Sequence, residues 1–197
     1  MRHIIIKNIN NYSDNLLDNF NVISPKKEKL AKIKDKKNKN LSILGEYILA
    51  KLLKKYYKIN YQNLKIKYND NNKPYINNYK IYYNISHSHD YVCVITSNYE
   101  CGIDIEKIRK VDLNVIKSFA TLKEQKYINN SYKRLFEIYC LKEAYLKMNG
   151  FKLADINNVE FIITKKKIIC SDSKVKCKLI YHKNYIVAIC EKASKNS

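Results

Sequence analysis

A chain of 197 residues is long enough for one sizeable hydrophobic core or for two small cores that abut. Its 46% hydrophobic and 28% charged residues are typical of a folded protein, which excludes a disordered chain. The formal net charge of +20 predicts an anionic partner, although part of the lysine excess belongs to a general bias toward Lys, Asn, Ile and Tyr.

Two features of the sequence predict where the protein works. Its six cysteines form no C-x-x-C pair, and most lie in apolar runs, which indicates small buried side chains in a reducing compartment. Only three isoleucines follow Met1-Arg2-His3, and no later apolar run approaches the roughly 18 residues of a membrane-spanning helix. We therefore expect a cytoplasmic protein without a membrane segment.

The first half of the chain is predicted to mix strands and helices. Ile4–Ile6 indicates a strand, and Ser24-Pro25 indicates a cap and a first-turn proline for a lysine-rich helix from Lys26 to about Lys39. From Leu41 the apolar residues step by three or four, which predicts an amphipathic helix. A turn at 69–74 should then lead into strands at about 81–85, 91–96 and 101–106.

The second half repeats this mixture. A helix is expected near Asp112, Thr121 and Glu124 match a capping box, and a long helix should run from Ser131 to Asn149 and stop at Gly150. Strands are predicted at 159–163, 167–170, 175–181 and 185–190. The elements thus form two similar halves divided near residue 102, without a linker or a repeat at residue level.

The strand at 101–106 carries two carboxylates. Side chains alternate along a strand, so Asp104 and Glu106 share one face and lie about 7 Å apart. They repel each other unless a cation lies between them, and hard oxygen ligands suit Mg²⁺. Gly102 on the same face would let a ligand approach the backbone. The alternative is an edge strand with a solvated acidic face.

The long helix adds a third carboxylate. Glu143 is spaced with the apolar residues Phe136 and Tyr139, so its side chain should point inward. A buried carboxylate must be protonated, paired or bound to a metal. A salt bridge to Lys147, one turn later, would satisfy Glu143 equally well, and Lys142 should project to the neighbouring face.

A polar segment, NISHSHD at residues 84–90, ends the preceding strand. Two histidines without a third nitrogen or sulfur ligand at the usual spacing argue against zinc. No strand-turn-helix elbow with flanking glycines surrounds Ser86 or Ser88, which argues against a serine nucleophile. The hydroxyl, imidazole and backbone donors favour a phosphate ligand.

Four motifs in order, NKPY (72–75), NISHS (84–88), GIDIEKI (102–108) and KEAYLK (142–147), resemble those of the 4′-phosphopantetheinyl transferases of the larger, Sfp-like type. The resemblance implies an α+β fold in which two similar α/β halves form an intramolecular pseudo-dimer. Residues 1–102 would bind the nucleotide of coenzyme A, and residues 103–197 would hold the metal site and dock the carrier protein. Such a chain is expected to work as a monomer.

The resemblance also implies a reaction. The enzymes of this family move the phosphopantetheine arm of coenzyme A onto a serine of an apo carrier protein and release adenosine 3′,5′-bisphosphate. Asp104, Glu106 and Glu143 would hold Mg²⁺, with Mn²⁺ as an open alternative. Glu143 is the favoured general base, and Lys147 would stabilise charge on the departing phosphate.

Coenzyme A contacts are implied as well. Lys147 and Ser86 or His87 would contact phosphates, and the backbone of Lys73 and Pro74 would flank the adenine. Lys26 and Lys29 are the best matches for the basic residues that bind the 3′-phosphate.

The chain departs from the family pattern at three positions. Tyr139 stands where the family has a tryptophan, which we interpret as a structural change, and Asn72 replaces a glycine, which Asn tolerates because it can adopt positive φ. Leu41 replaces an arginine, so Lys37 or Lys39 could substitute in the 3′-phosphate clamp.

An acidic acyl, peptidyl or polyketide carrier protein is the expected partner, and the segment between Val111 and Asn130 is its predicted docking surface. Neither a nucleic acid nor a membrane is expected as a partner. Two other functions are alternatives: a basic nucleic-acid-binding domain, which the scattered lysines and scarce arginines disfavour, and an inactive carrier-binding module. The complete set of charged residues disfavours the second.

Overall fold

The computed structural model describes residues 1–193, and the chain divides into two compact units, Met1–Asn98 and Tyr99–Ser197. Each unit has its own hydrophobic core. The boundary precedes strand β6 (Cys101–Lys107), so the division expected at residue 102 would cut this strand. No helix among residues 1–193 has the length and apolar character needed to cross a bilayer.

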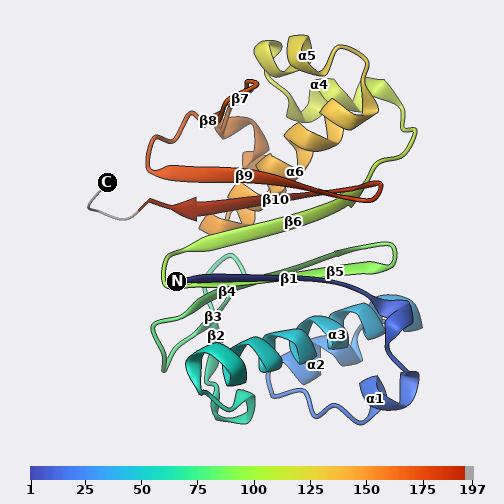
Figure 1. Cartoon of the computed structure of the whole chain (residues 1–197), viewed down its shortest axis with the longest axis vertical. Coiled ribbons are helices and arrows are strands. Elements are labelled where there is room, and N and C mark those ends of the chain that lie inside the picture. Colours follow the sequence, from blue (N-terminus) through green and yellow to red (C-terminus); the bar gives the residue numbers. More distant parts are fainter. Residues whose placement is uncertain (194–197) are drawn as a thin grey trace. The chain divides into compact units, whose positions relative to one another are not determined.

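The first unit is a three-stranded antiparallel sheet covered by one long helix (Figure 1). The strands lie in the order β1-β5-β4, and helix α3 packs on β5 and β4. A separate two-stranded sheet pairs β2 with β3. The elements are β1 (Arg2–Asn8), α3 (Lys36–Leu52), β2 (Ile66–Tyr68), β3 (Pro74–Ile76), β4 (Tyr82–Ser88) and β5 (Tyr91–Ser97).

The second unit repeats this topology. Its sheet has the order β6-β10-β9, helix α6 packs on β6 and β10, and β7 pairs with β8 in a small separate sheet. The elements are β6, α6 (Tyr132–Asn149), β7 (Phe161–Ile163), β8 (Ile168–Cys170), β9 (Val175–His182) and β10 (Tyr185–Lys192). In both units the second strand of a hairpin is therefore the central strand. The two similar halves expected from the sequence are thus confirmed as folds.

Short helices fill the connections. In the first unit they are η1 (Ile9–Asn11), α1 (Asp14–Asp18), α2 (Lys26–Ala31), η2 (Leu53–Tyr57) and η3 (Tyr61–Asn63). In the second unit they are η4 (Leu113–Val115), α4 (Ile116–Phe119), α5 (Leu122–Ile128) and η5 (Leu153–Asn158).

The predicted helix from Lys26 to Lys39 is wrong in its extent. Two helices occupy this stretch, because Asp35 caps the start of α3 by accepting a hydrogen bond from Asn38 N at 2.7 Å. Pro25 is the N-cap residue of α2 and follows a cis peptide bond, so it precedes the first turn that the sequence assigned to it.

Several local signals are confirmed. Thr121 and Glu124 form the predicted capping box of α5, Ser131 caps α6, and Gly150 ends α6 with φ 71°. Asn72 has φ 61°, so it adopts the left-handed conformation expected where the family has glycine.

Gly102 does not open a path for a ligand, which corrects the sequence interpretation. A Cβ atom there would lie 2.0 Å from Ala144 O and 2.6 Å from Met148 N, both backbone atoms of α6. The backbone of β6 thus touches the backbone of α6, and the face of β6 that carries Asp104 lies against this helix. In the first unit, a Cβ at Gly45 of α3 would lie 2.6 Å from Ile85 Cγ2, a side-chain atom of β4.

We expect Gly102→Ala to lower the free energy of unfolding by about 1–3 kcal/mol or more, because a helix backbone cannot yield to the new methyl group. Gly45→Ala is the matched control: its new methyl group meets a side chain and gains helix propensity, so its loss should be clearly smaller. Urea unfolding of both variants measures this. Equal losses would contradict the backbone contact.

Candidate active site

The contact between β6 and α6 gathers three carboxylates in the second unit. Asp104 on β6 is only 3% exposed, whereas Glu106 on β6 and Glu143 on α6 are half-buried. The charges of Asp104 and Glu106 both raise the pKa of Glu143, so the three groups lie close enough to repel one another. The burial of Asp104 excludes the alternative of a solvated acidic face.

Two basic side chains neutralise the carboxylates of β6. Lys147 Nζ lies 2.5 Å from Asp104 Oδ1, and Arg109 Nη1 lies 3.0 Å from Glu106 Oε2. Lys147, which the sequence placed beside Glu143, thus makes an ion pair with Asp104. The charge of Lys147 also lowers the pKa of Glu143, so this one ammonium group interacts favourably with both Asp104 and Glu143.

Glu143 is the carboxylate with a raised pKa. Burial is the main cause, and the charges of Asp104 and Glu106 add to it; the charge of Lys147 and a hydrogen bond from Tyr139 act in the opposite direction. Burial and the surrounding acids raise the pKa of Tyr139 to about 12, so its hydroxyl keeps its proton and donates to Glu143. Tyr139, which stands where the family has a tryptophan, therefore contacts Glu143 directly, and its structural role stays a prediction.

The thiol of Cys140 also faces this cluster. It donates to Ile186 O at 3.7 Å, and burial, together with the charges of Asp104 and Glu106, raises its pKa well above the ordinary value, so the thiol stays neutral. The sequence indicated only a small buried side chain at this position, because the approach of Asp104 depends on the packing of β6 against α6.

The donor chemistry of the three carboxylates fits a hard divalent cation, because such ions prefer oxygen ligands. Among residues 1–193, however, no three His, Cys, Asp or Glu side chains are already arranged as a metal site. The ammonium of Lys147 lies on Asp104 instead. The residues thus suit Mg²⁺ by type, and the ion pairs supply positive charge at the same carboxylates.

Lys142 is fully buried, which corrects the prediction that it projects to a neighbouring face. Its ammonium lies 2.9 Å from Glu124 Oε2 and donates to Val159 O at 2.7 Å and Ile156 O at 3.1 Å. Glu124 is fully buried too and accepts from Phe161 N at 2.8 Å. The pair therefore joins α5, α6 and β7.

A pocket of about 290 Å³ lies beside the carboxylates. Glu106, Arg109, Asp112 and Tyr139 line it together with the apolar side chains of Val111, Val115, Phe119, Leu135 and Phe136. Val115 of this lining is 44% exposed, and Leu122, further along the predicted docking segment, is 76% exposed. The predicted docking segment thus presents apolar groups next to Glu106.

In the first unit the structure brings Lys26 to a carboxylate that the sequence analysis missed. Lys26 Nζ lies 3.0 Å from Glu46 Oε1, and Tyr61 Oη donates to Glu46 Oε2 at 2.9 Å. Glu46 is only 5% exposed. Its place among the apolar residues of the predicted helix, directly after Leu44-Gly45, was the signal that could have revealed it.

Lys29 and the Lys73-Pro74 segment meet at the small sheet. Lys29 Nζ lies 3.5 Å from the ring centroid of Tyr68, and Tyr68 pairs directly with Pro74 across β2 and β3. Lys73 N donates to Asn69 Oδ1 at 2.8 Å, which closes the turn before Pro74. Three of the residues expected to contact coenzyme A therefore lie around one hairpin.

Ser86 and His87 lie within β4, so the polar segment does not end the strand where the sequence placed its end. The strand continues because β4 pairs with β5 as far as Ser88 and Tyr91. Successive side chains alternate, so the buried Ser86 and the exposed His87 point to opposite faces of the sheet. Lys37 was predicted as one possible substitute in the 3′-phosphate clamp. Its Nζ lies 2.6 Å from Asp90 Oδ1.

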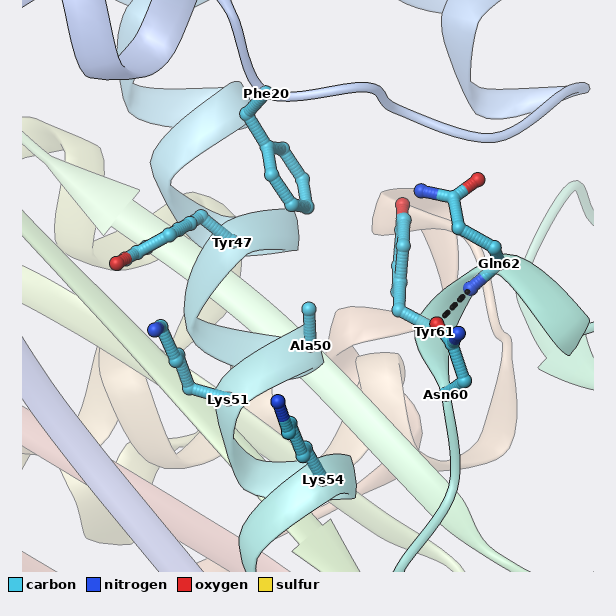
Figure 2. A pocket seen from close by; sticks show the side chains of 8 residues that line it. All are labelled: Phe20, Tyr47, Ala50, Lys51, Lys54, Asn60, Tyr61 and Gln62. Carbon is cyan, nitrogen blue, oxygen red and sulfur yellow. Dashed lines mark hydrogen bonds between the residues drawn. The ribbon is translucent and has the colours of Figure 1, made fainter.

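A second pocket, of about 230 Å³, lies between α3 and η3 (Figure 2). Its lining comprises Phe20, Tyr47, Ala50, Lys51, Lys54, Asn60, Tyr61 and Gln62. None of the site residues expected from the sequence lines it. Tyr61 connects this pocket with the Lys26–Glu46 ion pair, because its side chain lines the pocket and its hydroxyl donates a hydrogen bond to Glu46.

Comparison with known proteins agrees with this geometry. Residues 11–99 match the family described as 4′-phosphopantetheinyl transferase, N-terminal, and residues 100–190 match the 4′-phosphopantetheinyl transferase superfamily. Together the matches run through both units, so the chain belongs to the 4′-phosphopantetheinyl transferase superfamily. Within it, the chain is of the Sfp type, in which both units lie on one chain.

Three curated relatives are similar to the chain. The 4′-phosphopantetheinyl transferase gsp of Aneurinibacillus migulanus is 30% identical over 76% of this chain and 66% of the relative. Sfp of Bacillus subtilis is 24% identical over 65% and 60%, and a putative 4′-phosphopantetheinyl transferase of Haemophilus influenzae is 32% identical over 50% and 46%. The chain thus spans between about half and two thirds of these relatives.

One solved structure, the holo-[acyl-carrier-protein] synthase of Thermotoga maritima, is 18% identical with a TM-score of 0.42, over 49% of this chain and 64% of that chain. This similarity is too weak to support an argument about the fold.

We expect Lys142→Met to lower the free energy of unfolding by about 3–5 kcal/mol, because it leaves the buried charge of Glu124 without its cation. Lys36→Met is the matched control, since Lys36 makes an ion pair of similar length with Asp14 at the surface and should change stability little. Chemical unfolding measures both. Similar effects of the two substitutions would contradict the burial of the Lys142–Glu124 pair.

The raised pKa of Glu143 predicts that Glu143→Gln stabilises the metal-free protein near neutral pH. A carboxyl group with a raised pKa favours the folded state below its ordinary pKa and loses that contribution as pH rises through the folded value. The gain should therefore be present at pH 7 and shrink toward pH 4. Thermal unfolding in the presence of a chelator, from pH 4 to 8, measures it.

Glu160→Gln should change stability in the opposite direction, because hydrogen bonds from Lys123 and Thr121 lower the pKa of Glu160. This variant should lose stability near pH 7, and its difference from the parent should shrink toward pH 4. A loss of stability in Glu143→Gln at pH 7 would refute the electrostatic account of the cluster.

Proposed function

We propose that the chain transfers the 4′-phosphopantetheine arm of coenzyme A to a serine hydroxyl of an apo carrier protein and releases adenosine 3′,5′-bisphosphate. The observation that carries the proposal is the cluster of Asp104, Glu106, Glu143 and Lys147 at the contact of β6 and α6. Its similarity to relatives named 4′-phosphopantetheinyl transferases supports it. Membership of this family also favours a transferase over a nucleic-acid-binding domain.

Asp104, Glu106 and Glu143 would hold Mg²⁺, and Mn²⁺ would suit the same oxygen ligands. When bound, such an ion supplies charge neutralisation at the pyrophosphate of coenzyme A. Lys147 and Arg109 already carry positive charge at two of these carboxylates, so the site is adapted to an anionic substrate.

Glu143 would accept the proton of the serine hydroxyl. Its raised pKa makes it a stronger base than an exposed glutamate, and the hydrogen bond from Tyr139 holds its carboxylate in one orientation. Lys147, oriented by Asp104, would stabilise the charge on the departing phosphate. Phosphoryl transfer depends mainly on such alignment and charge stabilisation.

The first unit would bind the nucleotide of coenzyme A. Lys26 and Lys29 are proposed for the 3′-phosphate, with Glu46 orienting Lys26. Lys73 and Pro74 would flank the adenine through the backbone of the hairpin turn, and Ser86 or His87 would contact a phosphate. The meeting of Lys29 and Pro74 at Tyr68 supports this assignment.

The carrier protein would dock on the second unit along residues 111–130. The pocket beside Glu106 and the exposed Val115 and Leu122 offer apolar contacts. The net charge of +20 would steer an acidic carrier toward the enzyme. The cytoplasmic location and the monomeric state expected from the sequence stay predictions.

Intact-protein mass spectrometry tests the reaction. An apo carrier protein incubated with the chain, coenzyme A and Mg²⁺ should gain the mass of one phosphopantetheine, and a chelator should prevent the gain. Acyl, peptidyl and polyketide carriers are tested in parallel. Failure with all three, by a folded chain that binds coenzyme A, would indicate an inactive carrier-binding module.

Glu143→Gln should lower the rate of transfer at least 100-fold, because it removes the base, whereas its affinity for coenzyme A should fall much less. Glu160→Gln is a control outside the cluster and should remain active. Calorimetric titration with coenzyme A separates binding from chemistry. Undiminished turnover in Glu143→Gln would refute its role as base.

For docking, Leu122→Ser should raise the KM for the carrier protein several-fold, because it removes an exposed apolar contact, and should leave the KM for coenzyme A unchanged. Leu153→Ser is the control, since Leu153 is 60% exposed outside the proposed segment. Steady-state kinetics with each substrate varied in turn measure both. An unchanged KM for the carrier in Leu122→Ser would remove this residue from the docking surface.

A further inference from the structure

Three of the six cysteines line up across the strands of the second unit. Cys170 lies on β8, Cys177 on β9 and Cys190 on β10. The Sγ atoms of Cys177 and Cys190 are 3.1 Å apart, and Cys170 lies near enough to affect the pKa of Cys177. The sequence predicted isolated buried side chains here, because no two of these cysteines form a recognisable motif.

The backbone geometry suits a covalent link between Cys177 and Cys190. The two residues are directly opposite each other in the antiparallel pair of β9 and β10. Opposite residues in such a pair have Cα atoms about 4.5–5.5 Å apart, which lies within the range that disulfides span. Their sulfur atoms already touch, so little movement is needed to join them.

We propose that Cys177 and Cys190 form a redox-sensitive dithiol, which a low-molecular-weight disulfide such as glutathione disulfide converts to a cross-strand disulfide. Cys177 is half-buried, whereas Cys190 is fully buried, so Cys177 is the thiol that the oxidant reaches first. Cys170 is a neighbour of the pair, not a partner in the product.

The exchange takes place in two balanced steps. Deprotonated Cys177 attacks one sulfur of the glutathione disulfide, which forms a mixed disulfide and releases one glutathione thiolate. Deprotonated Cys190 then attacks Sγ of Cys177 and releases the second glutathione. Two protein thiols are oxidised, one glutathione disulfide is reduced to two thiols, and the protons of the protein thiols pass to the glutathione products.

The surroundings of Cys177 make this reaction slow near neutral pH. The hydrogen bond with Cys170 lowers the pKa of Cys177, but the hydrogen bond with Cys190 and burial raise it by more, so little thiolate is present. Oxidation should therefore quicken as pH rises. The site would respond to sustained oxidation and is reversed by an excess of reduced glutathione.

Oxidation would also remove a hydrogen bond from Cys190 to α6, the helix that carries Glu143. The thiol of Cys190 donates to Leu141 O of α6 at 3.6 Å, and a disulfide sulfur has no proton to donate. Leu141 lies two residues before Glu143. The dithiol thus contacts the helix that carries Glu143, although its existence does not depend on the proposed transferase activity.

The test is exposure of the full chain to glutathione disulfide at pH 8, followed by acid quenching, alkylation under denaturing conditions and peptide mapping. The expected product is about 2 Da lighter than the reduced chain, has four alkylated cysteines instead of six, and contains a peptide that links Cys177 to Cys190. Reduced glutathione in excess should restore six. The rate of formation should rise about tenfold from pH 7 to pH 8.

Cys177→Ser and Cys190→Ser should abolish the link, whereas Cys170→Ser and Cys140→Ser should retain it. Circular dichroism verifies that each variant is folded, and the map of the unmodified chain decides the pairing without any variant. Glutathione adducts without a link between the two cysteines, or a link between Cys170 and Cys177, would overturn the proposal. Neither result bears on transferase activity, which the mass gain of the carrier measures separately.

Discussion

The candidate site depends on the direct contact between the backbones of β6 and α6. Gly102 permits this contact, since any larger residue would meet the backbone of Ala144 and Met148. Because side chains alternate on β6, the face that touches the helix is also the face of Asp104 and Glu106. The same approach therefore brings two carboxylates of the strand to Glu143 and Lys147 of the helix. The packing of α6 on β6 and the arrangement of the site residues therefore depend on the same backbone contact.

Three partly buried carboxylates that lie close together destabilise the fold unless cations or hydrogen-bond donors compensate their negative charge. Lys147 and Arg109 offset two of the negative charges, and Tyr139 donates to the third. The compensation is incomplete, because the pKa of Glu143 remains raised. A residual cost of this kind is typical of functional sites, where the arrangement favours a ligand or a reaction over stability. The Lys142–Glu124 pair, with all its partners buried, ties α6, which carries Glu143, to α5 and β7.

Much of this arrangement could be predicted from local patterns. Alternation along residues 101–106 placed Asp104 and Glu106 on one face, and the helical period placed Glu143 inward. The partners could not be predicted in this way. Lys142 meets Glu124, and Lys26 meets Glu46, across distances in sequence that only the tertiary fold closes. The break between α2 and α3 was missed because a lysine-rich helix pattern outweighed the cap at Asp35.

The two units show how one topology supports different chemistry. Each packs a long helix on a three-stranded sheet through a glycine, and each helix carries an inward glutamate. In the first unit Glu46 has a lysine and a tyrosine hydroxyl as close partners. In the second unit Glu143 faces two further acids, and its pKa is raised. The repeated fold therefore accounts for the positions of these carboxylates, whereas their neighbours decide which of them can act as a base.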